Sequence, residues 1–74
     1  MAEGIVKNYF RSKGYGFIYL ANHPDVFFHY TELEDDYKIP QSGDKVEFEL
    51  EEVSEGRYKA CNVKFVAGRY SEVV

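Results

Sequence analysis

The residues of this chain best suited to chemistry are aromatic, because it has seven Tyr and six Phe, and no Trp, among 74 residues. A domain this small buries only about 60% of the surface that its unfolded chain exposes, so its core cannot hold all of these rings. A ring left in water can stack on another flat, unsaturated group, and each nucleobase stacked on a protein ring is worth ~1–3 kcal/mol. The composition therefore predicts an exposed aromatic face that binds a ligand.

Two segments, residues 15–20 and 25–30, place several rings where they could meet. Side chains alternate between the two faces of a β-strand. When Ile18 and Val26 point to the core, every second residue of each segment points outward. Only a short loop joins the segments, so we expect antiparallel neighbours. Their outward side chains then form one patch, made of Tyr15, Phe17, Phe27 and His29.

The competing interpretation is that these rings are core residues. The opposite faces of the same segments already supply an aliphatic core, and a small barrel cannot bury both faces. Lys7 and Lys13 lie near the patch in the sequence, where their ammonium groups would suit phosphates. Gly14 and Gly16 flank Tyr15, and glycine lets a strand coil tightly and lets another group come close. The pattern therefore favours an outward patch.

The fold class follows from short strand patterns at even spacing. Residues 31–34 read Thr-Glu-Leu-Glu, a capping box that allows one helical turn at most. The segments with strand patterns are 4–10, 15–20, 25–30, 45–51 and 58–66. They predict an all-β fold, a small closed barrel of five strands with at most one short helical turn.

The last two strand segments have alternating apolar residues that we expect in the core. In the fourth segment these residues alternate with glutamates and are Val46, Phe48 and Leu50. The fifth segment places Cys61 on one face with Val63 and Phe65. Cys61 is therefore predicted to be a small buried hydrophobe, and not a nucleophile. Arg57 and Lys59, in the loop before it, could approach the aromatic patch.

The remaining composition excludes several classes of function. A net charge of −4 argues against a protein that holds duplex DNA by charge alone. The single cysteine allows no internal disulfide, and no zinc-ligand spacing or phosphate-binding glycine motif is present. The chain also shows no signal peptide and no apolar run of ~20 residues. We expect a cytoplasmic protein that is not an enzyme and uses no metal or cofactor.

Two motifs carry a resemblance to a known family. Residues 13–18, KGYGFI, resemble the first RNA-binding motif that the RRM and cold-shock families share. Residues 26–30, VFFHY, resemble the second motif and follow the first, which is the cold-shock order, whereas an RRM has the reverse order and two helices. Residues 4–7 and 60–63 are similar to the terminal strands of the cold-shock domain. The resemblance runs from about Glu3 to Phe65.

The resemblance implies a five-stranded antiparallel OB-fold barrel over residues 1–66, with a C-terminal tail at residues 67–74. It also implies a monomer that binds single-stranded RNA or DNA, usually pyrimidine-rich, and acts as an RNA chaperone. Carried over by position, the nucleic-acid-binding residues would be Lys7, Tyr9, Lys13, Tyr15, Phe17, Phe27, His29, Tyr30 and Tyr37.

The chain departs from the family at the edge of this patch. Asn8 stands where most members have an exposed Trp, a loss of up to ~1–3 kcal/mol of stacking unless Tyr9 or Phe10 substitutes. Tyr19 is an added outward ring that would extend the patch. The missing Trp and the acidic charge leave one alternative open, an OB-fold protein-interaction module with weak or no nucleic-acid binding.

Overall fold

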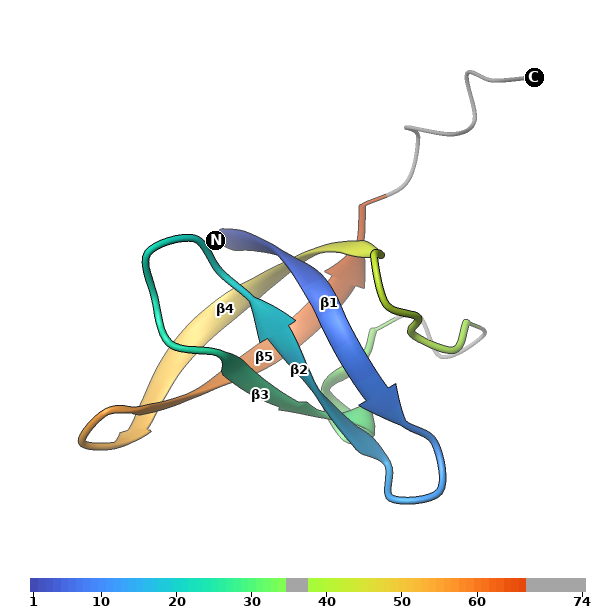
Figure 1. The fold of residues 1–74 in the computed structure, drawn as a ribbon, viewed down its shortest axis with the longest axis horizontal. Coiled ribbons are helices and arrows are strands. Elements are labelled where there is room, and N and C mark those ends of the chain that lie inside the picture. The colour runs from blue at the N-terminus through green and yellow to red at the C-terminus, as the bar shows by residue number, and fades with distance from the viewer. Residues whose placement is uncertain (35–37, 67–74) are drawn as a thin grey trace.

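The computed structural model of the chain describes residues 1–34 and 38–66. These residues form five strands and one short 3₁₀ turn (Figure 1), which confirms the predicted all-β barrel with at most one helical turn. The predicted tail at 67–74 lies outside the described residues. The elements are β1 (Ala2–Phe10), β2 (Tyr15–Tyr19), β3 (Val26–His29), η1 (Tyr30–Glu32), β4 (Lys45–Ser54) and β5 (Arg57–Phe65). In the described part of the chain, no helix is long and apolar enough to span a bilayer.

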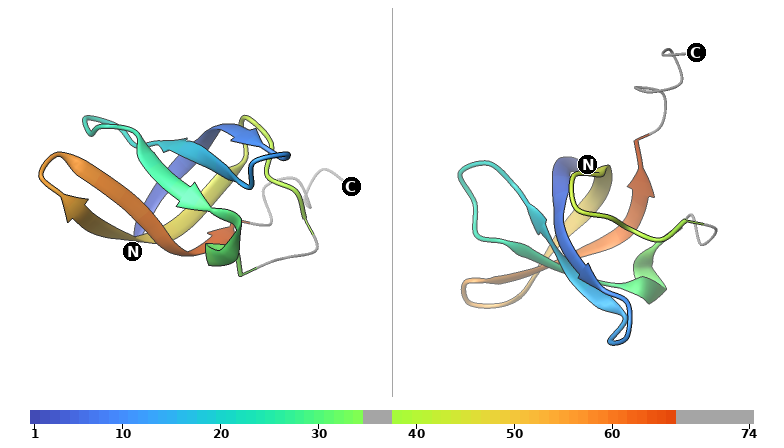
Figure 2. Two further views of the ribbon diagram at one scale, coloured as in Figure 1. Left: turned by 90° about the horizontal axis from the view of Figure 1, so that it is seen from below. Right: turned by 45° about the vertical axis from the view of Figure 1, so that its right-hand side comes forward.

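The strands close into a barrel in the order β1-β2-β3-β5-β4 (Figure 2). Neighbours are antiparallel except β3 and β5, which run parallel and meet at Phe27 and Lys59. Closure leaves no long open edge on which another chain could add a strand. The parallel contact also brings the hairpin of β4 and β5 beside β3, which matters for the site described below.

The barrel interior is filled by aliphatic residues, one alanine and two phenylalanines. No charged or polar side chain is buried among the described residues. Every strand contributes at least one inward residue, because the alternation of each strand turns its apolar positions to the axis. The buried hydrophobic residues of this core are Val6, Ile18, Val26, Phe28, Val46, Phe48, Ala60 and Val63.

An irregularity in β1 changes which of its residues face outward. The pairing with β2 slips between Val6 and Asn8, which leaves Lys7 as an extra residue in β1. A bulge of this kind reverses the inside-outside phase of the residues that follow it. The strands come so close here that a Cβ on Gly16, opposite Tyr9, would collide with the backbone carbonyl of Asn8.

The prediction that Leu50 belongs to the core is wrong. Val46 and Phe48 are fully buried, as predicted, but Leu50 is 40% exposed. The register of β4 against β5 shifts between Glu47 and Glu49, and every residue of β4 from Glu49 onward is exposed. This half of β4 extends with β5 as a hairpin away from the barrel (Figure 1).

Cys61 is half-buried, so the prediction of a buried cysteine is also wrong. The cause is Asn62, whose φ of 52° lies in the left-handed region and interrupts the alternation of β5. As a result Ala60 and Val63, three residues apart, are the buried positions of β5, and Phe65 is only partly buried.

The short helical turn exists, but the predicted capping box at 31–34 does not cap it. The turn η1 begins at Tyr30, and its N-cap is His29, whose ring accepts a hydrogen bond from the backbone N–H of Thr31. The sequence pattern missed this because histidine is not among the residues usually expected at an N-cap.

Substitution of the two neighbouring apolar residues of β4 tests this assignment of the core. Phe48→Ala should lower the free energy of unfolding by ~3–5 kcal/mol, because it empties a fully buried site. Leu50→Ala should change the free energy of unfolding by less than about 1 kcal/mol, because the hairpin leaves Leu50 in water. Urea unfolding of both variants measures the difference, and equal losses would contradict the exposed position of Leu50.

Candidate functional site

The outer face of β1, β2 and β3 presents an aromatic cluster of four rings. Phe17 and Phe27 are cross-strand partners with ring centroids 6.0 Å apart. Tyr15 lies 6.1 Å from Phe17 and 5.5 Å from Phe27. Phe10 extends the cluster through Tyr15, at 5.5 Å. All four contacts are edge-to-face or tilted, so the cluster is not a parallel stack.

The predicted alternation of β2 and β3 explains why these rings face water. Ile18, Val26 and Phe28 are buried, while Phe17 and Phe27 between them are only partly covered. Barrel closure fixes the register of the two strands, so the rings stand opposite each other. The structure thus brings Tyr15, Phe17, Phe27 and His29 together as predicted from the sequence.

Phe10, and not Tyr9, belongs to the aromatic cluster. The bulge in β1 turns Tyr9 inward, opposite Gly16, where its ring stacks on Phe28 with centroids 5.7 Å and planes 14° apart. The same shift turns Phe10 outward beside Tyr15, with 41% of its surface exposed. The structure therefore places Tyr9 against the core, apart from the cluster. No signal in the sequence marked the bulge.

His29 and Tyr30 continue the exposed surface past Tyr15. His29 pairs with Tyr15 across the strands. Its Nδ1 lies 2.9 Å from Oγ1 of Thr31 and accepts the backbone N–H of Thr31 at 3.3 Å, so these local contacts use Nδ1 and not Nε2.

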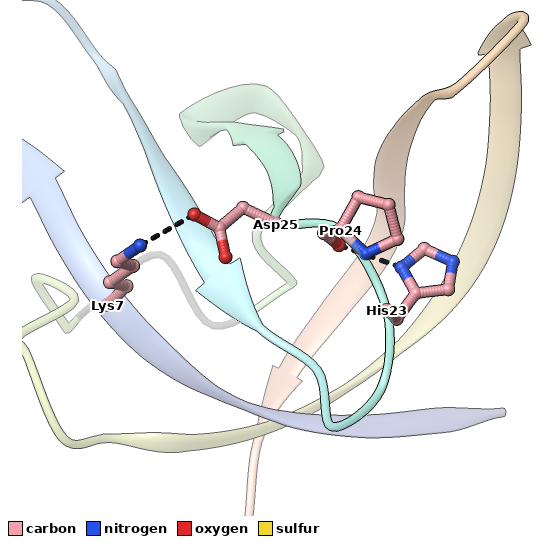
Figure 3. Close-up of polar contacts among 4 residues, drawn as sticks. All are labelled: Lys7, His23, Pro24 and Asp25. Atoms are coloured by element: carbon pink, nitrogen blue, oxygen red, sulfur yellow. Dashed lines mark hydrogen bonds and ion pairs between the residues drawn. The ribbon is translucent and has the colours of Figure 1, made fainter.

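The cationic side chains predicted near the patch differ in whether they form an ion pair. The Nζ of Lys7 contacts Oδ2 of Asp25 at 2.7 Å (Figure 3). This ion pair spans β2, because Lys7 lies on β1 and Asp25 immediately precedes β3. Lys13 and Arg11, in the turn between β1 and β2, are exposed and form no ion pair with another described residue. They are available to a phosphate, whereas Lys7 must first leave Asp25.

The β4–β5 hairpin adds a groove to the edge of the cluster. This hairpin groove has a volume of about 490 Å³. Its side chains join Phe17 and Phe27 of the cluster to cationic and aromatic residues of the hairpin. Arg57 and Lys59 thus approach the patch as the sequence suggested. The residues that line the groove include Phe17, Asp25, Phe27, Val53, Arg57, Tyr58 and Lys59.

Tyr58 also fixes the loop between β2 and β3 against the hairpin. Its ring centroid lies 4.4 Å from that of His23, in an edge-to-face contact. His23 in turn lies with Nδ1 2.8 Å from the carbonyl oxygen of Pro24 (Figure 3). These contacts hold the β2–β3 loop in place, and Asp25 at the end of this loop lines the hairpin groove. No sequence motif marked Tyr58 or Asp25 as functional.

Two further positions named in the sequence comparison with the family remain. Tyr37 lies outside the described residues. Asn8, opposite Phe17 in the register, has an amide where the family resemblance places an exposed Trp, and its Oδ1 is buried without a hydrogen-bond partner among the described residues. No group of His, Cys, Asp or Glu side chains in the described part of the chain could hold a metal ion.

The environment of Cys61 makes it a poor nucleophile despite its partial exposure. Partial burial raises the pKa of the Cys61 thiol, as does the hydrogen bond that its Sγ donates to Oε1 of Glu51 at 3.2 Å. The negative charges of Glu51 and Glu32 act in the same direction, and Lys59 opposes them. Because the thiolate is the reactive form, a raised pKa lowers reactivity at a given pH.

Comparison with known proteins gives consistent matches over almost the whole chain. The family model described as "'Cold-shock' DNA-binding domain" matches residues 2–66. Cold shock protein CspA of Staphylococcus haemolyticus is 40% identical over 65 residues, which cover 86% of this chain and 98% of that protein. Cold shock protein CspC of Bacillus subtilis is 38% identical over 65 residues, with coverages of 86% and 97%.

A solved structure has the same fold. Drosophila Unr CSD456 superposes with a TM-score of 0.74 at 26% identity, over 92% of this chain. The chain spans 27% of that longer structure. The superposition confirms the cold-shock type of barrel that the family resemblance implied.

The raised pKa of Cys61 predicts slow alkylation. At mildly alkaline pH the folded protein should react with iodoacetamide more slowly than a free thiol, because less of Cys61 is thiolate. Glu51→Gln should speed the reaction by removing the hydrogen-bonded carboxylate. Glu55→Gln, in the turn of the same hairpin, is the matched control and should leave the rate unchanged. A wild-type rate equal to that of a free thiol would contradict the raised pKa.

Proposed function

The chain belongs to the cold-shock domain family, a family of DNA-binding domains and not of enzymes, and we propose that it binds single-stranded RNA or DNA by stacking bases on the aromatic cluster. The observation that supports this most directly is the contiguity of the rings of Tyr15, Phe17 and Phe27, with centroids 5.5 to 6.1 Å apart. Stacked bases in a duplex strand are only ~3.4 Å apart, so rings at this spacing suit unstacked bases.

A single strand fits this surface better than a duplex does. The faces of bases in a duplex are covered by their neighbours, whereas an unpaired base offers a face to any exposed ring. The net charge of −4 also works against binding that depends on the phosphates of a duplex. A stacking surface with few cations instead predicts an affinity that falls only modestly with salt.

We assign a role to each predicted residue according to its position. The rings of the aromatic cluster and of Tyr30 stack on bases, and His29 stacks or donates from Nε2 to a base edge. Lys13 contacts phosphate directly, and Lys7 does so after it leaves Asp25. Tyr9 supports the cluster from the inside through Phe28. A preference for pyrimidine-rich strands is the expectation that comes with the family, and the binding role predicted for Tyr37 stays a prediction.

Phe10 compensates in part for Asn8. The family resemblance places an exposed Trp at position 8, and the amide of Asn8 cannot replace its stacking. The bulge that turns Tyr9 inward turns Phe10 outward to the same edge of the cluster, 5.5 Å from Tyr15. We therefore propose that Phe10 supplies the base platform of β1, displaced by two residues from the usual one.

Binding of this kind suits an RNA chaperone that holds transient single strands. Such a role needs weak, rapidly reversible binding that tolerates many sequences, which stacking provides. The single cysteine and the likeness to bacterial cold shock proteins support action as a monomer in the cytoplasm.

The acidic net charge favours a second candidate, a module that binds a protein through the same aromatic cluster. The elution volume with and without an oligonucleotide separates the two. A monomer that elutes earlier with the oligonucleotide supports nucleic-acid binding. A stable dimer whose elution volume does not change with the oligonucleotide supports the protein-binding module.

Removal of single rings from the cluster should weaken binding without unfolding the barrel. Phe17→Ala and Phe27→Ala should each lower the affinity for a labelled oligo-dT by about 5- to 150-fold, the equivalent of ~1–3 kcal/mol for one stacked base. Fluorescence anisotropy measures the affinity, and circular dichroism checks the fold. Leu50→Ala, an exposed apolar residue away from the cluster, is the control. Unchanged affinity in both folded ring variants would refute the proposal.

The ion pair between Lys7 and Asp25 should restrain binding. Asp25→Asn frees Lys7 for a phosphate, so we expect tighter binding and a salt dependence steeper by ~0.7 in the log–log slope. Stability should change by less than about 1 kcal/mol, because Lys7 is 54% and Asp25 39% exposed. Glu34→Gln makes the same change in net charge within a distant ion pair with Lys64. Equal effects of the two variants would show that only the net charge matters.

A further inference from the structure

A second apolar surface lies on the same outer face of β2, beyond Phe17. Ile5 and Tyr19 are cross-strand partners on β1 and β2, and they are 41% and 52% exposed. Both line a hollow of about 180 Å³, here called the Tyr19 hollow. Isolated exposed apolar residues are ordinary, but two that face each other around a hollow indicate a binding surface. The ring of Tyr19 packs against no other ring in the described part of the chain.

Tyr19 continues the row of rings that begins at Tyr15. Phe17 and Tyr19 are two residues apart on one face of β2, a distance of ~6.8 Å along a strand. This spacing is close to the 6.1 Å between the ring centroids of Tyr15 and Phe17. The aromatic cluster and the Tyr19 hollow therefore repeat one spacing, twice the ~3.4 Å of stacked bases in a duplex strand. A strand that unstacks its bases over Tyr15 and Phe17 reaches Tyr19 next.

Charged groups on the rim limit where a phosphate can lie. Lys45, which pairs with Ile5 across β1 and β4, lines the hollow and forms no ion pair with another described residue. Glu3 also lines the hollow, and its carboxylate would repel a phosphate. The backbone of a strand entering the hollow must therefore lie near Lys45. Toward Phe17 the ion pair of Lys7 and Asp25 crosses β2 (Figure 3), so Lys7 reaches the connecting phosphate only after it leaves Asp25.

We infer that the Tyr19 hollow is a further nucleotide-binding site, occupied by the continuation of the strand bound on the aromatic cluster. A base stacks on Tyr19 against Ile5, and Lys45 contacts the adjoining phosphate. This inference rests on the proposed function, since the strand arrives from the cluster. It assigns to the chain a longer binding path than the cluster alone provides.

The dependence of affinity on strand length tests the inference. Oligo-dT of about four and about ten nucleotides both fall in the range that an OB fold covers, ~4–16 nucleotides. Tyr19→Ser should leave the affinity for the shorter strand unchanged and weaken binding of the longer strand by about 5- to 150-fold, the loss of one stacked base. Tyr19→Phe keeps the ring and should retain the wild-type affinity for both lengths. Leu50→Ser, another exposed apolar residue, is the control.

The outcomes separate this inference from the proposed function. If Phe17→Ala weakens both lengths and Tyr19→Ser weakens neither, the cluster binds nucleic acid and the Tyr19 hollow does not. If the wild-type protein binds neither length, both proposals fall. If Tyr19→Ser abolishes a dimer seen by light scattering while leaving strand binding unchanged, the hollow is an interface between copies of this chain, and the inference is overturned.

A direct readout uses the three isoleucines of the chain, Ile5, Ile18 and Ile39. Isotope labelling of their methyl groups gives few signals, of which only Ile5 lies in the hollow. The longer oligo-dT should shift the Ile5 methyl resonance, while the buried Ile18 should move little with either strand. The shorter oligo-dT should leave Ile5 in place. An Ile5 methyl resonance that does not shift with the longer strand would overturn the inference, even if Tyr19→Ser lowered the affinity for that strand.

Discussion

The interior of the five-stranded barrel is the constraint on which the rest of the structure depends. Two phenylalanines, five branched aliphatic residues and one alanine fill it, and no polar side chain is buried among the described residues. Once Phe28 and Phe48 occupy this space, the other rings of β1, β2 and β3 must lie at the surface or half-buried. Closure of the barrel through the parallel contact of β3 and β5 then sets the β4–β5 hairpin beside those rings. The outer aromatic face is thus a consequence of how the core is filled.

The sequence predicted the barrel and the centre of the site because β2 and β3 alternate without interruption. Gly16, Ile18, Val26 and Phe28 turn inward, and the residues between them turn outward, so counting by two was sufficient. The same counting failed for Cys61, which the left-handed Asn62 brings partly to the surface. The role that the resemblance gave to Tyr9 failed for a related reason, because the extra residue Lys7 turns Tyr9 inward and Phe10 outward. Neither event has a signal in the pattern of apolar residues.

Other parts of the site could not be predicted because they depend on contacts between distant segments. The role of Asp25 depends on the fold, which brings its Oδ2 to 2.7 Å from Nζ of Lys7 across β2. Tyr58 lies beside the cluster because β5 returns parallel to β3, a topology that strand patterns do not reveal. Leu50 was mispredicted although the alternation of apolar residues in β4 is regular, because its part of β4 extends beyond the barrel. Alternation predicts the faces of a strand, and only the complete fold determines what covers each face.

Stacking and charge contribute to this surface in unequal measure. The chain has a net charge of −4, one of the nearby lysines is already paired with Asp25, and Lys59 lies 3.7 Å from Glu51. The rings have no such competitors, and their faces accept any base. The account therefore assigns affinity mainly to the aromatic cluster, while the few free cations orient the strand.

The measurement that tests this claim most directly compares two labelled strands of equal length, one of thymidines and one of abasic sites, at low and moderate salt. Both have the same number of phosphates, and only the first has bases to stack. The account predicts saturable binding of the thymidine strand that weakens modestly with salt, and much weaker binding of the abasic strand. Equal binding of the two strands would contradict it, because the phosphates alone would then account for the affinity.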